Sequence, residues 1–185
     1  MGQANKLLLP YRKHTVIEET LAQLSGSPVN HIIVVTGYQH EQVEKTIAGH
    51  ISPRIKIIRN REFVSGRAES IRCAVEHIPE ASDAVLFMVA DKPTVPTALI
   101  NRAIERYRKD RPPILYVMTP TGRGHPIIFS RKLFPELLLL RGDCVGEDLV
   151  AEYKSEVIEV YDGKLQIDVD TEDDYRILLK NESGK

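Results

Sequence analysis

Acidic side chains follow two extended stretches of the sequence and could hold a metal ion. Asp91 comes directly after the apolar run 84–90 and before a Lys-Pro pair, so a rigid turn fixes its carboxylate at a strand end. Asp168 and Asp170 stand at alternate positions, which predicts that both carboxylates point to one side of an extended segment. Mg²⁺ typically takes one or two carboxylates and leaves its other sites to water and phosphate. Asp91 with one of the other two would suit Mg²⁺. The alternative is that Asp91 caps a helix or turn, that Asp170 or Thr171 caps the last helix, and that Asp168 is solvated.

Two loops rich in glycine offer hydrogen-bond donors to a ligand. Ser65, Gly66 and Arg67 precede a predicted helix, where backbone N–H groups and a guanidinium could meet an anion or a base edge. The segment 121–126 contains two glycines, which let a backbone approach a ligand closely, and His125 as a further donor. An ordinary surface turn is the alternative for both loops.

A lone cation, Lys6, stands ahead of the apolar residues 7–10 near the start of the chain. Lysines in such positions usually face solvent. A role for Lys6 in binding therefore depends on which groups the fold places around it.

The elements that must position these residues alternate between apolar runs and segments of helical period. This alternation is typical of a mostly parallel sheet with helices on both faces. Strands are predicted at 31–36, 56–58, 84–90, 114–118 and 126–129, with a hairpin of 157–161 and 164–169 around Asp162 and Gly163. Helices are predicted at 15–24, 40–48, 68–77, 96–108, 131–140, 147–153 and 171–179.

Length and composition fit one α/β domain. The chain has 185 residues, of which 42% are hydrophobic, and we expect a single domain over 1–180 with a polar tail at 181–185. Its 25 Lys and Arg balance 26 Asp and Glu, so neither nucleic acid nor membrane is an expected partner. Two cysteines without a CxxC pair argue against a structural zinc site or a disulfide scaffold, and we expect a cytoplasmic protein. Neither a signal peptide nor an apolar span of membrane length is present in the sequence given.

Taken together, these motifs resemble those of the MobA-like nucleotidyltransferases, and within them the molybdenum cofactor cytidylyltransferase branch. The matching residues occur in the family's order. They are Met1, Gly2, 5–10, 34–37, Asn60, 65–66, 69–72, 90–93, 124–126, 142–143, Gly146, 168–171 and 173–175.

The resemblance implies a three-layer Rossmann-like fold of the glycosyltransferase-A type and a reaction that joins a nucleoside triphosphate to a phosphorylated acceptor with release of pyrophosphate. By that resemblance CTP is the substrate, a molybdopterin-type compound is the acceptor, and a molybdenum hydroxylase is a candidate partner. Asp91 would bind Mg²⁺ with Asp168 or Asp170 as a second ligand, and Lys6 would neutralise the triphosphate. The nucleotide-binding residues would be Lys6, Thr36, Gly37, Asn60, Ser65, Gly66 and Arg67, and the acceptor-binding residues Gly124, His125 and Pro126.

Two features depart from the family pattern. Gly66, Arg67 and Ala68 stand where the family has Gly-Met and small residues, which bears on the choice of base or acceptor. The family's opening strand and its Gly-x-Gly-x-Arg loop should precede Met1 and are missing, so we expect an N-terminally truncated domain, as from a start assigned too late. A true short form that closes the sheet differently and binds nucleotide poorly or not at all is the alternative. That strand would lie in the middle of the sheet, so we predict either an unfilled slot beside Val34 and Val89 or another segment pairing there.

The sequence leaves two other functions open. One is nucleotidyl transfer to a sugar phosphate or another small phosphorylated acceptor. The other is a non-catalytic protein that binds the cofactor or acts as a chaperone for molybdenum hydroxylases.

Overall fold

The structure is a computed structural model that describes residues 5–144, 146–154, 157–164 and 166–180. The helices are α1 (Val16–Ser25), α2 (His40–Ile47), α3 (Arg67–Val75), α4 (Thr97–Asp110), α5 (Phe134–Leu139), α6 (Glu147–Glu152) and α7 (Glu172–Lys180), with 3₁₀ turns η1 (Lys6–Leu8), η2 (Ala48–His50), η3 (Phe63–Ser65) and η4 (Arg131–Leu133). The strands are β1 (Pro10–Tyr11), β2 (His14–Thr15), β3 (Ile32–Thr36), β4 (Ile55–Arg59), β5 (Ala84–Phe87), β6 (Ile114–Thr119), β7 (Gly122–Ser130) and β8 (Val157–Tyr161).

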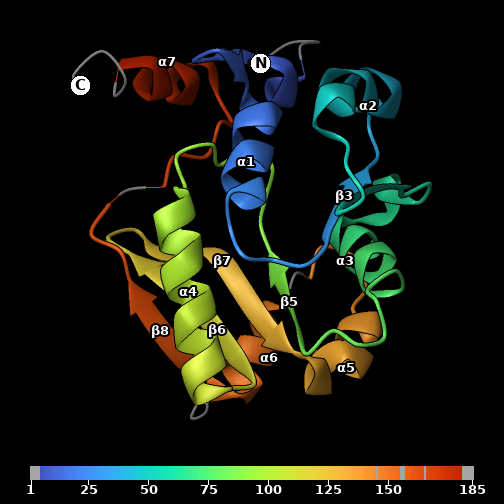
Figure 1. The fold of residues 1–185 in the computed structure, drawn as a ribbon, viewed down its shortest axis with the longest axis vertical. Helices are drawn as coiled ribbons and strands as arrows, with labels where there is room; N and C mark the ends of the chain where they lie inside the picture. Colours follow the sequence, from blue (N-terminus) through green and yellow to red (C-terminus); the bar gives the residue numbers. More distant parts are fainter. Residues whose placement is uncertain (1–4, 145, 155–156, 165, 181–185) are drawn as a thin grey trace.

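A four-stranded sheet in the order β5-β7-β6-β8 forms one half of the fold. Strand β8 is parallel to β6, whereas β7 is antiparallel to both of its neighbours. Strands β3 and β4 form a separate parallel pair, in which Ile32 lies opposite Ile55 and Thr36 opposite Arg59. Figure 1 shows the two sets of strands side by side with helices around them, the α/β arrangement that the sequence predicted.

The core of the four-stranded half lies on both faces of β6. Ile114 and Tyr116 pack toward α3, α5 and α6, while Leu115 and Val117 pack toward α4, as the alternation of side chains along a strand requires. Burial on both faces explains why β6 is a continuous apolar run in the sequence. In Figure 1, α4 covers the near face of this half.

The β3–β4 pair has its own core, which α1 and α2 complete. Ile17 and Leu21 of α1 and Val43 and Ile47 of α2 are buried together with Ile32. Helix α1 begins with a capping box, in which the Glu18 carboxylate accepts hydrogen bonds from the backbone N–H and hydroxyl of Thr15. This cap fixes where the helix starts relative to the strands.

A cavity of about 960 Å³ separates β3 from β5, and no described residue pairs with the facing edges of these two strands. Val34 and Val89 both line it, so of the two predicted alternatives the structure shows the unfilled slot and, among the described residues, no other segment pairing there. All four residues of β5 are only partly buried, although they are apolar. We refer to this space between β3 and β5 as the slot.

Several elements differ from the sequence prediction. Strand β5 ends at Phe87 rather than residue 90, because its pairing with β7 stops at Ile127, next to an irregularity at Gly124. Strand β7 begins at Gly122, so the predicted loop is part of a strand. The predicted hairpin around Asp162 and Gly163 is wrong: β8 pairs with β6 alone, and the described residues of 164–169 are not in a strand.

Residues 10–15 form a small hairpin of β1 and β2, which the sequence did not predict. The predicted polar tail, 181–185, lies outside the described residues. Among the helices that the structure describes, none is long and apolar enough to cross a membrane.

Candidate active site

Lys6 lies between two carboxylates at the ends of the strands. Its Nζ is 2.5 Å from Oδ2 of Asp91 and 2.5 Å from Oδ1 of Asp170, although these residues are 85 and 164 positions away in the chain. The short turn η1 holds Lys6 in place, because the side chain of Asn5 accepts a hydrogen bond from the N–H of Leu7 at its start. The lone cation of the sequence is thus paired with two of the predicted metal ligands.

The second carboxylate oxygen of Asp91, Oδ1, is buried and has no hydrogen-bond partner among the described residues. A buried anionic oxygen without a partner is costly unless a cation or a donor approaches it. The backbone around Asp91 is fixed, since Thr20 donates to the carbonyl of Ala90 at 3.0 Å and the N–H of Val169 donates to the carbonyl of Asp91 at 3.3 Å. The oxygen donors of Asp91 and Asp170 therefore fit a hard divalent cation such as Mg²⁺ or Mn²⁺.

Asp168 faces a different partner from Asp170. Its Oδ1 is 2.9 Å from Nζ of Lys92, whose side chain is only 12% exposed. The segment that carries Asp168 and Asp170 is not a regular strand, and the two carboxylates meet different lysines. Asp170, which shares Lys6 with Asp91, is the better placed second ligand.

The protonation state of Lys6 follows from its surroundings. Partial burial works against the charge, but the hydrogen bonds to Asp170 and Asp91 and the attraction of both carboxylates outweigh it, so the pKa of Lys6 is raised from its ordinary value of 10.5. Lys6 is a cation at neutral pH and can meet the negative charge of a phosphate.

A second cavity, of about 500 Å³, opens beside these charges. Four of the predicted nucleotide and metal residues line it: Lys6, Thr36, Gly37 and Asp170. It also shares the lining residues Val34, Val35 and Ala90 with the slot, so the two spaces meet at the carboxyl ends of β3 and β5. Ligands of open α/β sheets gather at such strand ends.

At the end of β3 the backbone lies close to the side chain of Phe63. A Cβ on Gly37 would come within 2.7 Å of the Cβ of Phe63, so only glycine fits there without a shift. Thr36 is buried and donates to Glu44 at 2.7 Å, which joins the end of β3 to α2. These contacts give Thr36 and Gly37 a structural role at the edge of the cavity.

The predicted base-binding loop packs against a second loop. Asn60 is buried, and its side chain donates to Ser70 at 3.0 Å and accepts from the N–H of Glu62 at 2.9 Å. Gly66 has φ +119°, and a Cβ there would lie 2.3 Å from the carbonyl oxygen of Gly142. The positive φ and the short distance to Gly142 explain why residue 66 is a glycine.

The side chains of the same loop point outward. Ser65 and Arg67 are exposed, and Arg67 donates to the carbonyl of Asp143 at 3.1 Å. Arg67 also lines the slot, whereas Asn60, Ser65 and Gly66 line neither cavity. The loop 60–67 borders the end of β3, where the N–H of Asn60 donates to the carbonyl of Thr36 at 2.8 Å, and Arg67 is the one of these four predicted residues that lines a cavity.

The predicted acceptor residues Gly124, His125 and Pro126 form the irregular part of β7. The N–H of His125 donates to Gln166 at 2.7 Å, and Gln166 donates back to the carbonyl of His125 at 2.5 Å. A Cβ on Gly124 would lie 2.6 Å from the Gln166 side chain. Gly124 and His125 line the slot. The absence of a side chain at 124 lets the segment carrying Asp168 and Asp170 lie close to β7.

The imidazole of His125 is uncharged at neutral pH. Burial lowers its pKa below the ordinary value of 6.5 and the positive Lys92 adds to this, against a hydrogen bond to the carbonyl of Phe87 and the charges of Asp168 and Asp91. Its Nδ1 lies 3.3 Å from that carbonyl oxygen and therefore carries the proton.

Sequence reasoning missed Lys92 and Gln166, which hold Asp168 and His125. The only signal for Lys92 was its place directly after Asp91 in the chain, and nothing in the sequence marked Gln166. Their roles depend on the path of 166–170 across the strand ends.

A sheet flanked by helices, with two carboxylates and a lysine near its strand ends, suits the binding of a metal ion and a triphosphate, as nucleotidyltransferases require. The chain belongs to the family of the MobA-like NTP transferase domain, which matches residues 1–157.

Individual relatives extend this result over nearly the whole chain. The molybdenum cofactor cytidylyltransferase of Escherichia coli (strain K12) is 27% identical over 95% of this chain and 86% of its own length. The nicotine blue oxidoreductase of Paenarthrobacter nicotinovorans is 23% identical over 96% of this chain and 90% of its own length. The crystal structure of Rv0371C from Mycobacterium tuberculosis H37Rv, a complex with manganese, is 28% identical with a TM-score of 0.81 and covers 97% of this chain and 93% of that one. The fold is therefore the Rossmann-like fold of nucleotidyltransferases, and the protein is a transferase of that family.

Proposed function

We propose that this protein transfers CMP from CTP to molybdopterin or its molybdenum-bearing form, with Mg²⁺ and with release of pyrophosphate. One observation carries the proposal: Lys6 joins Asp91 and Asp170 beside a cavity at the strand ends, and a buried oxygen of Asp91 is left for a cation. The cytidylyltransferase among the relatives supports the choice of base and acceptor.

Each residue of the site would have its own role in the transfer. Asp91 and Asp170 would hold Mg²⁺, which supplies charge neutralisation for the triphosphate. Lys6 contacts the phosphates from the same side and adds positive charge where the pyrophosphate leaves. An acceptor phosphate oxygen attacks the α-phosphorus, a new P–O–P bond forms, and the bond to the β-phosphate breaks. This step needs alignment and charge neutralisation, and no nucleophilic side chain.

The choice of base and acceptor would rest with the remaining predicted residues. Arg67 is exposed at the loop 60–67 and offers a donor to the base, and Gly124 and His125 face the slot next to Asp168 and would meet the acceptor. An uncharged His125 that carries its proton on Nδ1 can accept one hydrogen bond at Nε2 without attracting free phosphate.

The test is a panel of the four ribonucleoside triphosphates with Mg²⁺ and molybdopterin, with pyrophosphate release as the measurement. CTP should give the fastest release, and release should depend on the acceptor. A matched pair of variants, Asp91→Asn and Asp173→Asn, links the activity to the site, since Asp173 is an exposed carboxylate on α7. Faster release with another nucleotide would overturn the choice of CTP.

A second candidate is transfer to a sugar phosphate or another small phosphorylated acceptor. The observation in its favour is that relatives of similar identity differ in their named activity. One is a molybdenum cofactor cytidylyltransferase and another is a nicotine blue oxidoreductase. Pyrophosphate release that requires a sugar phosphate and ignores molybdopterin would favour this candidate.

We also propose that the active enzyme holds an extended segment in the slot, as a strand between β3 and β5 that precedes residue 1. Both facing strand edges lack partners among the described residues, and the slot is lined by apolar side chains such as Val34 and Leu86. Asn5 and Lys6 line the adjoining cavity at the carboxyl ends of β3 and β5, so a parallel strand leaving the slot would arrive next to the start of the chain. Its backbone would satisfy the donors and acceptors of both edges.

A synthetic peptide of about six β-branched apolar residues, long enough to match the five of β3, tests this proposal. At 100 times its dissociation constant the peptide should raise the free energy of unfolding by about 2.7 kcal/mol. The control is the same peptide with two central residues changed to proline, which removes two N–H donors. Equal effects of both peptides, or none from either, would contradict strand addition.

A further inference from the structure

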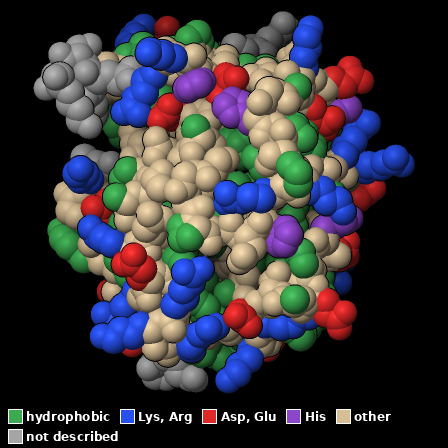
Figure 2. Space-filling view, viewed as in Figure 1, with side chains coloured by type: hydrophobic (Ala, Val, Ile, Leu, Met, Phe, Trp, Pro, Cys, Tyr) green, Lys and Arg blue, Asp and Glu red, His purple; other side chains and the backbone are tan. Residues whose placement is uncertain are grey.

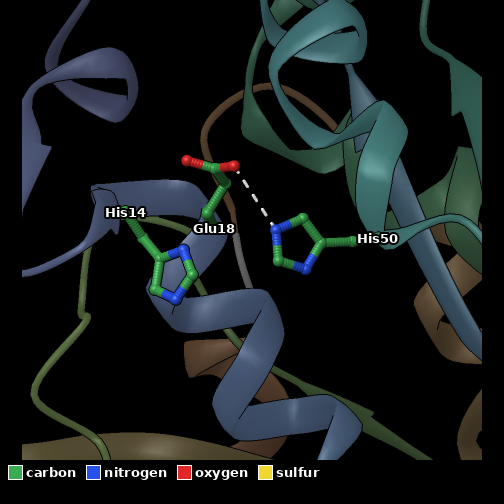
Figure 3. A group of neighbouring side chains, drawn as sticks. All are labelled: His14, Glu18 and His50. Carbon is green, nitrogen blue, oxygen red and sulfur yellow. Dashed lines mark hydrogen bonds and ion pairs between the residues drawn. The ribbon is translucent and has the colours of Figure 1, made fainter.

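Three side chains outside the candidate active site converge on one point at the surface: His14 of β2, Glu18 in the first turn of α1, and His50 at the end of η2. Each offers one ligand atom, and these atoms all lie within 4.8 Å of one another. Figure 3 shows both imidazole rings and the carboxylate projecting into the space between α1 and the segment that carries His50. We call them the His-Glu-His cluster.

The spacing within the cluster suits shared coordination better than direct hydrogen bonding. Nε2 of His50 lies 3.4 Å from Oε1 of Glu18, longer than the usual range of about 2.7–3.2 Å for such a bond. Two ligands of a tetrahedral ion with bonds of about 2.1 Å are about 3.4 Å apart. The most distant pair must close by at most about 1.4 Å to reach that value, and a rotation of the exposed His14 side chain supplies such a movement.

The carboxylate of the cluster is held in position by the helix cap. Oε2 of Glu18 accepts two hydrogen bonds of 2.8 Å from Thr15, which leaves Oε1 directed toward His50. Partial burial opposes ionisation, but the hydrogen bonds from Thr15 and the neighbouring His50 lower the pKa of Glu18. The carboxylate is therefore anionic at neutral pH, and its second oxygen is oriented as metal ligands usually are.

The cluster is open on one side. The side chains of His50 and Glu18 are 24% and 20% exposed, and His14 is exposed. Two imidazoles and one carboxylate with a free position for water form a donor set that suits Zn²⁺ and similar borderline ions, rather than Mg²⁺. The edge contact of the two rings, with centroids 5.9 Å apart and an angle of 68°, leaves room for an ion beside them.

We propose that His14, Glu18 and His50 form a binding site for Zn²⁺ or a similar divalent transition-metal ion, separate from the carboxylates at the strand ends. The ion joins the β1–β2 hairpin and the start of α1, which follow one another in the chain, to η2, which lies more than 30 residues further on. Its fourth ligand is water, so the site also has a position for an anionic ligand. This site does not depend on the proposed nucleotidyl transfer.

The test uses the full chain without a polyhistidine tag, titrated with Zn²⁺ in competition with a chromophoric chelator. Excess Mg²⁺ is present to occupy the oxygen ligands of Asp91. One Zn²⁺ should bind per chain, and His14→Gln and His50→Gln should each weaken binding at least about 10-fold. The matched control is His31→Gln, an exposed histidine outside the cluster, which should leave the affinity unchanged.

A second measurement keeps the result independent of folding defects. Circular dichroism checks that the variants are folded, and thermal unfolding with and without Zn²⁺ should show stabilisation in the wild type and in Asp91→Asn, but not in His50→Gln. Equal Zn²⁺ affinity in His14→Gln, His50→Gln and the control would overturn the site. Loss of Zn²⁺ binding in Asp91→Asn would overturn it as well, since it would assign the ion to the strand ends.

Discussion

The molecule has two places where a cation fits, and they differ in what already occupies them. At the strand ends, Asp91 and Asp170 offer only oxygen, and the ammonium of Lys6 lies between them. In the His-Glu-His cluster two imidazoles face one carboxylate, and no described lysine or arginine pairs with that carboxylate. Figure 2 shows acidic, basic and histidine side chains interspersed over one face of the protein.

The two places differ in the ligand atoms that they offer and in whether a lysine already pairs with them. Each therefore favours a different kind of ion. An ion entering at Asp91 must compete with Lys6, which favours arrival together with a triphosphate that offers Lys6 new partners. An ion entering the cluster displaces only a long hydrogen bond between His50 and Glu18. The first place suits a cation that comes and goes with substrate, and the second a resident ion.

The largest effect is expected for Asp91→Asn. Loss of the carboxylate should lower the rate of pyrophosphate release about 10³-fold, about 4 kcal/mol of transition-state stabilisation. Asp168→Asn is the matched comparison and should cost much less, because Asp168 pairs with Lys92 instead of Lys6. Equal losses in steady-state assays of the two variants would make Asp168, and not Asp170, the partner of Asp91.

Lys6→Met should have opposite effects on transfer and on metal binding. Without its charge, kcat/KM for the triphosphate should fall about 10²-fold, roughly 3 kcal/mol. In the absence of nucleotide, however, Mn²⁺ should bind more tightly, because two carboxylates lose the cation that pairs them.

Calorimetric titration measures the binding, and Lys6→Arg keeps the charge as a control. Weaker Mn²⁺ binding in Lys6→Met than in Lys6→Arg would show that Lys6 assists the ion instead of competing with it.

A third imidazole, His125, should make the stability of the fold depend on pH without any metal ion. Its pKa is lowered in the folded state, so the unfolded chain binds more protons as the pH falls below 6.5. The free energy of unfolding should decrease from pH 6.5 down to the lowered pKa and change no further below it on account of this group.

Urea unfolding across this range, with His125→Gln as the reference, measures the effect. The variant should lack this slope. The same slope in wild type and variant would mean that His125 is protonated in the folded state.

The smallest effect is expected for Glu18→Gln, which tests the cap that orients the cluster. Because the folded pKa of Glu18 lies below 4.5, the ionised carboxylate stabilises the fold above that pH, and its contribution is lost as the pH falls through the folded pKa. The variant should be less stable by about 0.5–1 kcal/mol near pH 7 and equal to wild type at low pH. Denaturant unfolding at the two pH values shows whether the difference disappears, and a constant difference would assign it to shape instead of charge.

Most of the regular elements were predictable because the burial of a strand or helix shows in the local pattern of apolar residues. Strand β6 is buried on both faces and reads as an uninterrupted apolar run, and α4 shows the helical period that packs one face on the sheet. The hairpin after β8 was not predictable in this way. A turn signal at Asp162 and Gly163 says nothing about the contacts that the following segment makes. In the structure its N–H groups donate to the hydroxyl of Thr94 and the carbonyl of Asp91, and the neighbouring His125 contacts the carbonyl of Phe87.

The candidate site was predictable in part. Asp91 stood out because a carboxylate after seven apolar residues must lie at a strand end. The choice between Asp168 and Asp170 depended on the alternation of side chains, which holds only in a regular strand, and the segment is irregular. The structure separates the two, one toward Lys92 and the other toward Lys6.

The sequence by itself determined the class of fold, the carboxylate at the end of the apolar run and the place of glycine where backbones approach, since these follow from local burial and local conformation. Only the tertiary structure decided that Lys6 meets Asp91 and Asp170, that a slot lies between β3 and β5, and that His14, Glu18 and His50 converge. The reason is distance along the chain: contacts between residues tens of positions apart depend on how the elements pack, and no local pattern encodes that packing.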